Sequence, residues 1–316
     1  MTEPSASPLI LHHYATSPFS EKVRLILGYK RLAWRSVTVP MVLPKPDVVA
    51  LTGGYRRTPF LQIGADIYCD SALIARVLER LAPEPTLYPP ASAGSAELLA
   101  QWADSALFWT AIPYTMQPAG LASIFGSAPP EAIKAFGADR AAMTPGFRRP
   151  TIADGSVQLQ TYLGWLERQL DDGRAFFGGE QPSIADFSVA HPLWFIRRAP
   201  PVTGVLDACP QLMAWYERVL ALGQKWQAAG TLHAEEALRI AADAGSHAPA
   251  EVQTGLGFEA GESVTVAATD YGSDPVSGQL VGLDSEEVAV RRINERAGAV
   301  VVHFPRIGFQ IRKGAA

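Results

Sequence analysis

The first 88 residues alternate short apolar runs with amphipathic segments, a pattern typical of a mixed α/β domain. Each strand-like run is too short to be a helix and is bounded by Gly, Pro, Ser, Thr or Asp. An amphipathic helix separates the first two strands, which implies that they pair in parallel. The pattern predicts strands over residues 9–11, 35–39, 58–63 and 67–69, and helices over 18–27, 45–51 and 71–81.

Residues 93–243 have apolar positions at helical spacing, so this segment is predicted to be an all-helical domain. A proline-rich run over 83–90 forms a stiff boundary before it. Pro113 is expected to kink or stop one helix. Ser183 and Asp186 have the spacing of a capping box and open a mostly apolar helix, which should lie at the centre of the bundle.

After a linker rich in Gly, Ala and Pro, over 245–257, the hydrophobic period changes to two. Five short runs at roughly even spacing predict strands, and such a series is typical of a small barrel. Residues 251–316 are therefore predicted to form a small all-β, barrel-like domain after the α/β and all-α domains. The predicted strands are 264–268, 279–281, 288–290, 300–304 and 309–311.

Charge and composition narrow the class of function. The chain has 316 residues, 48% of them hydrophobic, and a net charge of -4, which argues against a nucleic-acid partner. Residues 1–8 carry no basic residue before an apolar run. No segment reaches the roughly 18 to 20 apolar residues of a membrane span. We therefore expect a soluble, cytoplasmic protein with no membrane partner.

The cysteines and histidines do not form a metal-binding or disulfide pattern. Cys69 and Cys209 are too few and too far apart for a disulfide framework or a CxxC site, and both are expected to be buried. The six histidines lack HxxxH or HxxH spacing, so no metal is expected.

The stretch 14–27 is the candidate site of chemistry, because it joins a strand to the start of a helix. A helix start offers unpaired N–H groups and a partial positive charge, which favour a hydroxyl or a thiolate there. Ser17, directly before Pro18, lies at this start. The alternative is that Ser17 is only an N-cap, which stabilises a helix by roughly 1 kcal/mol. Asp70 and Ser71, before the helix over 71–81, allow the same two interpretations.

In their order and spacing, these motifs resemble the glutathione transferase family over residues 1–240. The resemblance implies a thioredoxin-like first domain that holds glutathione, and a helical domain that supplies most of the pocket for a hydrophobic co-substrate. The run from Ser17 to Glu21 is most similar to omega-type members, whose first position is usually Cys; theta- and zeta-type members have Ser in this loop. The motifs are Ser17-Pro18-Phe19-Ser20, Thr58-Pro59, Asp70-Ser71 and the box at Ser183 and Asp186.

The resemblance implies that Ser17 is the catalytic residue. Its hydroxyl would donate a hydrogen bond to the glutathione sulfur and favour thiolate over thiol, helped by the helix N-terminus. Tyr14 and Ser20 are further candidates for this hydroxyl. Because Ser17 stands where omega-type members have Cys, disulfide exchange at this position is not expected.

Five further residues match the positions that bind glutathione in the family. Thr58, before a cis Pro59, would bind the cysteinyl backbone as an added strand does. Asp70 and Ser71 would bind the γ-glutamyl end at a helix N-terminus, although the family's acid is usually Glu or Gln. Lys45 lies where omega-type members direct a Lys to the glycyl carboxylate.

The function that follows is a cytoplasmic glutathione transferase that adds the thiolate to an electrophilic apolar or aromatic substrate, as in detoxification. Glutathione is its co-substrate, and the family implies a homodimer. Two alternatives stay open: a binding or scaffold protein on the same fold whose tail docks a partner, and a glutathione-dependent isomerase, for which Ser17 is also suitable.

Overall fold

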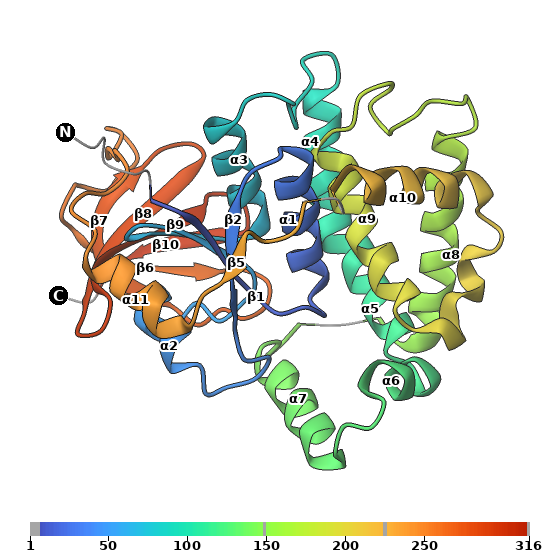
Figure 1. The fold of residues 1–316 in the computed structure, drawn as a ribbon, viewed down its shortest axis with the longest axis horizontal. Coiled ribbons are helices and arrows are strands. Elements are labelled where there is room, and N and C mark those ends of the chain that lie inside the picture. Colours follow the sequence, from blue (N-terminus) through green and yellow to red (C-terminus); the bar gives the residue numbers. More distant parts are fainter. Residues whose placement is uncertain (1–6, 148–149, 224–225, 315–316) are drawn as a thin grey trace.

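Residues 7–147, 150–223 and 226–314 are described by the structure, which is a computed structural model. Within these ranges ten strands form one sheet, in the order β10-β6-β7-β8-β9-β4-β3-β1-β2-β5, and a helical bundle stands beside it (Figure 1). The strands are β1 (Leu9–His13), β2 (Trp34–Thr38), β3 (Phe60–Ile63), β4 (Asp66–Cys69), β5 (Gly230–Thr231), β6 (Ser263–Ala268), β7 (Val276–Leu283), β8 (Glu287–Asn294), β9 (Gly298–Pro305) and β10 (Phe309–Lys313).

The first four strands include the parallel pair of β1 and β2 that the hydrophobic pattern predicts. β1 and β2 are parallel, while β3 is antiparallel to both β1 and β4. Because side chains alternate across a sheet, Leu61 and Tyr68 join the core under α1 (Pro18–Tyr29) and α3 (Ser71–Leu81). Phe60 and Ile67 point to the opposite core, under α2 (Pro46–Thr52). The α/β class of the first domain is confirmed.

The segment after residue 93 is helical, as predicted. Pro113 lies inside α5, which ends at Thr115, so the helix stops soon after the proline. A π-helical turn, η1, precedes α5. The elements are α4 (Ala93–Trp102), η1 (Ala103–Leu107), α5 (Phe108–Thr115), α6 (Pro118–Phe125), α7 (Pro130–Ala142), α8 (Ile152–Gln169), α9 (Ile184–Arg197), the 3₁₀ turn η2 (Pro200–Leu206), α10 (Pro210–Gly223) and α11 (Ala234–Ala242).

Helix α9 lies at the centre of the bundle, and the predicted capping box at its start is confirmed. The carboxylate of Asp186 accepts from the Ser183 and Phe177 N–H groups, at 2.8 and 3.0 Å. It also accepts from Trp215 Nε1 at 2.8 Å, which ties α9 to α10. Because these donors are all directed at one buried carboxylate, the box fixes the start of the central helix.

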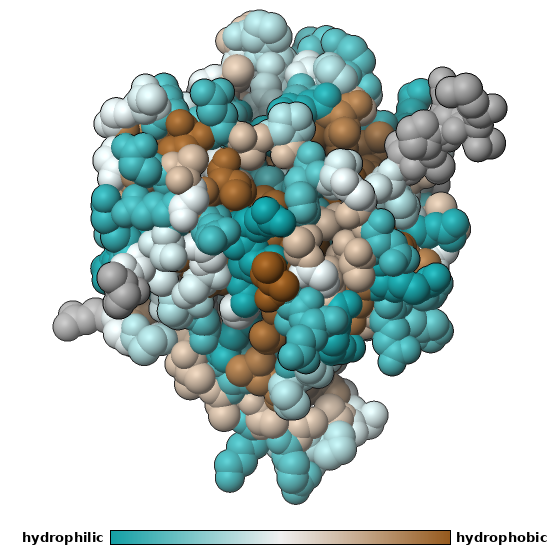
Figure 2. All heavy atoms as spheres, turned by 90° about the vertical axis from the view of Figure 1, so that its left-hand side faces the viewer, coloured by the Kyte–Doolittle hydropathy of each residue, from teal (hydrophilic) through white to brown (hydrophobic). Residues whose placement is uncertain are grey.

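The predicted C-terminal strands are present, and they continue the first sheet. β6 to β9 form an antiparallel series, β10 pairs with β6, and β9 lies parallel to β4. The expected barrel is thus an open set of strands that meets the first domain at β4 and shares one hydrophobic core with α2 and β3. Figure 2 shows the face formed by these strands, where hydrophobic residues are scattered among hydrophilic ones.

The end of the predicted helical segment returns to the first domain. β5 pairs with β2, and the carbonyl of Ala237 in α11 accepts from Gln62 Nε2 at 2.8 Å. α11 therefore packs on the sheet and not in the bundle. Cys69 and Cys209 are both buried, as predicted. Among the described helices none combines the length and apolar character that crossing a membrane requires.

Candidate functional site

Strand register brings the candidate residues to one edge of the sheet. His12 is paired with Phe60, and Phe60 is paired with Cys69. The end of β1, the start of β3 and the end of β4 therefore lie side by side. Ser17 follows β1, Thr58 precedes β3 and Asp70 follows β4, so these three residues lie at the same edge.

Ser17 is the N-cap of α1. Its Oγ accepts from the Ser20 N–H at 3.2 Å, and the side chain is 2% exposed. The capping role is therefore present in the structure. Since Oγ acts there as an acceptor, its own proton is left to donate, and the described residues provide no acceptor for it.

The two other candidate hydroxyls have different surroundings. Ser20 Oγ is buried inside α1, with no hydrogen-bond partner within the described ranges. Tyr14 is half-buried, and its hydroxyl accepts from Arg140 Nη2 at 3.4 Å. Of the three residues, only Ser17 is the N-cap of α1, where the positive field of the helix N-terminus acts most directly.

Thr58 presents a backbone that suits a peptide-like ligand. The Thr58–Pro59 bond is cis, as the resemblance implies, and ladder pairing of β3 begins only at Phe60. In the described part of the chain, neither the N–H nor the C=O of Thr58 has a hydrogen-bond partner. Such a pair can be used by an extended peptide that adds to the strand.

Asp70 and Ser71 open α3 beside Thr58. Asp70 has a φ of 75°, uncommon for a residue other than Gly, and its Oδ1 accepts from the Ala72 N–H at 2.9 Å. Burial raises the pKa of Asp70, although the hydrogen bond from Ala72 and the charge of Arg57 oppose the rise. Backbone strain of this kind is common at binding sites.

Ser71 contacts a buried ion network that the sequence pattern did not predict. Its Oγ accepts from Lys22 Nζ at 3.3 Å, and Lys22 Nζ also contacts Asp104 Oδ2 at 2.5 Å. Asp104 Oδ1 is 3.0 Å from His191 Nε2, so the network joins α1, η1 and α9. Lys22 is fully buried, although its position in the helical pattern is typical of a residue that faces solvent.

Lys45 lies in a basic cluster at the same end of the sheet. Its buried Nζ donates to the Arg56 carbonyl at 3.3 Å. Burial and then the charge of Arg140 lower the pKa of Lys45 to about 8, while Asp139 acts in the opposite direction. Arg56 and Arg140 are the other basic residues of the cluster, and both contact Asp139, so its charge is partly neutralised within the chain.

Arg57 was not predicted, and it lies directly before Thr58. Its Nη2 donates to Asp270 Oδ1 and to the Tyr271 carbonyl, both in the loop between β6 and β7. The C-terminal strands therefore reach the candidate site. The sequence gives little indication of this role of Arg57, because two consecutive arginines before a strand are normally solvated.

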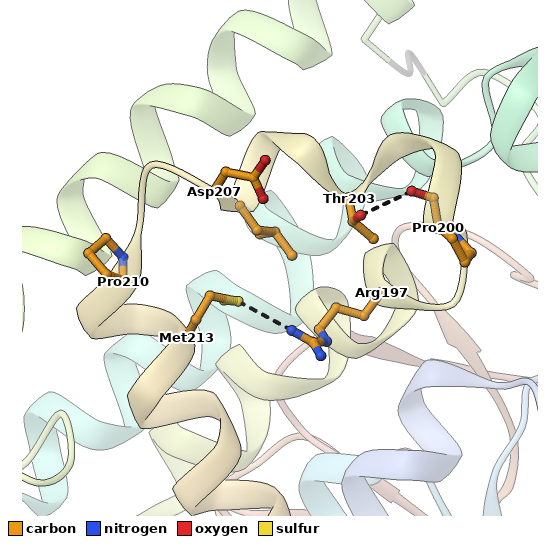
Figure 3. Close-up of a pocket in the computed structure, with 7 residues that line it drawn as sticks. Arg197, Pro200, Thr203, Asp207, Pro210 and Met213 are labelled. Carbon is orange, nitrogen blue, oxygen red and sulfur yellow. Dashed lines mark hydrogen bonds between the residues drawn. The ribbon is translucent and has the colours of Figure 1, made fainter.

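Two clefts lie elsewhere in the molecule. One, of about 380 Å³, is between α9, η2 and α10, where Arg197 faces Met213 and the Thr203 hydroxyl is directed at the Pro200 carbonyl (Figure 3). The other, of about 890 Å³, lies between β4, α3 and the C-terminal strands, beside His303. Neither contains Ser17 or Thr58. Within the described ranges, no group of three His, Cys, Asp or Glu could hold a metal ion.

Comparison with known proteins identifies the family and supports the fold. Residues 11–86 match the model of the glutathione S-transferase N-terminal domain, and residues 149–218 match that of the C-terminal domain. A GST-like protein from Pseudomonas syringae is 42% identical, with 98% of this chain and 100% of that chain covered and a TM-score of 0.80. This match extends over the C-terminal strands.

More distant structures share the fold of the first two segments. A glutathione S-transferase from Rhodospirillum rubrum F11 is 24% identical over 67% of this chain and 88% of its own, with a TM-score of 0.53. Glutathione S-transferase III in its apo form is 22% identical over 77% of this chain and 100% of its own, with a TM-score of 0.53. No curated protein matches the sequence. From the 42% identity across nearly the whole length, the chain belongs to the glutathione S-transferase family.

Proposed function

We propose that the protein is a glutathione transferase that uses Ser17 to stabilise the glutathione thiolate. The observation that carries the proposal is the position of Ser17, Thr58 and Ser71 at one sheet edge, with the backbone of Thr58 unpaired in the described residues. Glutathione would lie along Thr58, with its γ-glutamyl end at Asp70 and Ser71 and its glycyl carboxylate at Lys45.

In this mechanism Ser17 does not take the thiol proton. The proton leaves to solvent, and the Ser17 hydroxyl donates a hydrogen bond to the sulfur, which carries the negative charge. The N-terminal field of α1 acts in the same direction. The thiolate electron pair then forms the carbon–sulfur bond with an electrophilic aromatic or apolar carbon, and a halide or other leaving group departs.

The electrophile would enter from the helical side. Phe19 lies two residues after Ser17, and its ring packs on Phe108 of α5 with 4.6 Å between centroids. Trp109 is the next residue of α5, and its ring lies 4.7 Å from that of Phe147. These aromatic rings provide an apolar wall. The homodimer, the cytoplasmic location and the role in detoxification that the family implies belong to the same proposal.

Ser17→Ala tests the proposal. We expect kcat/KM for conjugation of chlorodinitrobenzene to fall by about 10- to 100-fold, since a hydrogen bond to a charged group contributes about 1.5–3 kcal/mol. Thr151→Ala is the matched control, because Thr151 caps α8 in the same way, with its Oγ 3.1 Å from the Asp154 N–H. Each variant should lose about 1 kcal/mol of stability. Equal activity in the two variants would show that Ser17 is only a cap.

A further inference from the structure

The loop between β6 and β7, residues 269–275, crosses from the C-terminal strands to the helical segment. The Gly272 N–H donates to the Met143 carbonyl at 2.6 Å. Gly272 has a φ of 52°, and a Cβ there would lie 2.9 Å from Met143 Cε and 3.4 Å from Arg57 Cγ. The loop is thus fitted closely between the end of α7 and the arginine that precedes Thr58.

The ring of Tyr271 lies between the two halves of the candidate site. The Arg57 guanidinium lies 3.9 Å from its centroid. Trp109 of α5 also contacts the ring, with 4.9 Å between centroids and an interplanar angle of 82°. Trp109 follows Phe108, which packs on Phe19 near Ser17. The aromatic wall of the electrophile side therefore continues into a residue of the C-terminal strands.

The polar atoms around Tyr271 are only partly satisfied. Arg57 is 7% exposed, and its Nε has no hydrogen-bond partner within the described residues. Burial raises the pKa of Tyr271, with Asp70 and Tyr14 among the groups that raise it further and Arg57 opposing. The phenol therefore stays protonated and lies among groups of the glutathione site. Buried polar groups are normally paired, so the unpaired Arg57 Nε indicates a place for a ligand.

We propose that Tyr271 is a specificity-determining residue, whose ring limits the size of the aromatic electrophile that can lie between Trp109 and the glutathione sulfur. This inference rests on the proposed transferase function. The C-terminal strands then supply part of the substrate site. They do so through a flat side chain that is held in place by Arg57.

Substitutions of opposite size test this role. At saturating glutathione, kcat/KM is measured for chlorodinitrobenzene and for the two-ring chlorodinitronaphthalene. Tyr271→Ala should raise the ratio of two-ring to one-ring activity by about tenfold, and Tyr271→Trp should lower it by about tenfold, because small changes in pocket size alter discrimination by about 10- to 200-fold. Tyr271→Phe keeps the ring and should keep the ratio. Ser273→Ala, at an exposed position of the same loop, is the control.

A ratio that is unchanged in both size variants, or that moves in the same direction in both, would overturn the inference. Loss of folding alone would lower both activities without moving the ratio in opposite directions. Calorimetric binding of glutathione to the wild-type protein separates this result from failure of the proposed function. Glutathione binding with an unchanged ratio of two-ring to one-ring activity would contradict only the role of Tyr271. Absence of both binding and conjugation would contradict the transferase function as well.

Discussion

Among the places where the C-terminal strands touch the first domain, two differ in kind. At the far contact, β9 pairs with β4, and His303 bridges two carboxylates: Nε2 is 2.9 Å from Asp66, and Nδ1 contacts Glu287. At the near contact, the β6–β7 loop meets Arg57 beside Thr58. Both nitrogens of His303 are paired, whereas Arg57 Nε has no hydrogen-bond partner within the described residues.

The difference is between His303, whose partners are all supplied by the chain, and Arg57, one of whose nitrogens has no partner within the described residues. A polar group whose partners are all supplied by the chain has nothing left to offer a ligand, and it contributes to folding. A polar group left unpaired at the edge of a site can bind one. We therefore expect the far contact to govern stability and the near contact to govern activity.

The largest effect should come from breaking the far contact with His303→Gln. The side chain is 2% exposed, and removing one partner of a buried charged group costs about 3–5 kcal/mol. Urea unfolding should show a loss of about 3 kcal/mol at pH 6. Glutathione affinity should be unchanged. Arg296→Ala is the control, because its pair with Asp47, at 2.7 Å, is an exposed contact worth about 0.5 kcal/mol.

The same variant should show a defined pH dependence. Burial alone would lower the pKa of His303, but the hydrogen bonds and charges of Asp66 and Glu287 raise it above 6.5. A raised folded-state pKa gives stability that is complete below the unfolded value and is lost as pH rises through the folded value. The difference in unfolding free energy between wild type and His303→Gln should therefore shrink from pH 6 to pH 9.

The pH dependence has to be measured as a difference between wild type and His303→Gln, because other histidines change the free energy of unfolding with pH in the opposite direction. Burial lowers the pKa of His12 and His13 to about 4, so their contribution is present above pH 6.5 and is lost as pH falls towards 4. A difference between wild type and His303→Gln that grows with pH would contradict the assignment of the far contact.

A smaller effect is expected at the near end, from Lys45. Because its pKa is lowered to about 8, Lys45 is charged at pH 7 and largely neutral at pH 9. Affinity for S-methylglutathione, which has no thiol to titrate, should fall about fivefold over this range, as expected for loss of about 1 kcal/mol of ion pairing. Lys45→Arg keeps its charge at pH 9. Its affinity should therefore not show the part of the decrease that comes from neutralisation of Lys45. Identical pH profiles for the two proteins would exclude Lys45 from the binding site.

The local sequence pattern was sufficient to predict structures that lie within a single element. The alternating strands, the amphipathic helix over 71–81 and the box at Ser183 and Asp186 all depend on residues close in sequence. The helix over 130–142 has no buried residue and so no apolar stripe, which leaves the local pattern little to detect.

Long-range contacts were beyond the reach of the pattern. The alternation in 264–311 predicted strands but not their partner, because the pairing of β9 with β4 joins residues more than 200 positions apart. For the same reason Arg57, Tyr271 and the network at Lys22 were missed. Their chemistry depends on what the fold brings beside them.

The central claim is that the shared sheet edge holds glutathione, and calorimetric titration with glutathione tests it most directly. Wild type is compared with Ser71→Ala, and with Ser156→Ala on the exposed face of α8 as the control. We predict saturable binding that Ser71→Ala weakens by tenfold or more, about 1.4 kcal/mol, and that Ser156→Ala leaves unchanged. No detectable binding to the wild type at millimolar glutathione would contradict the account.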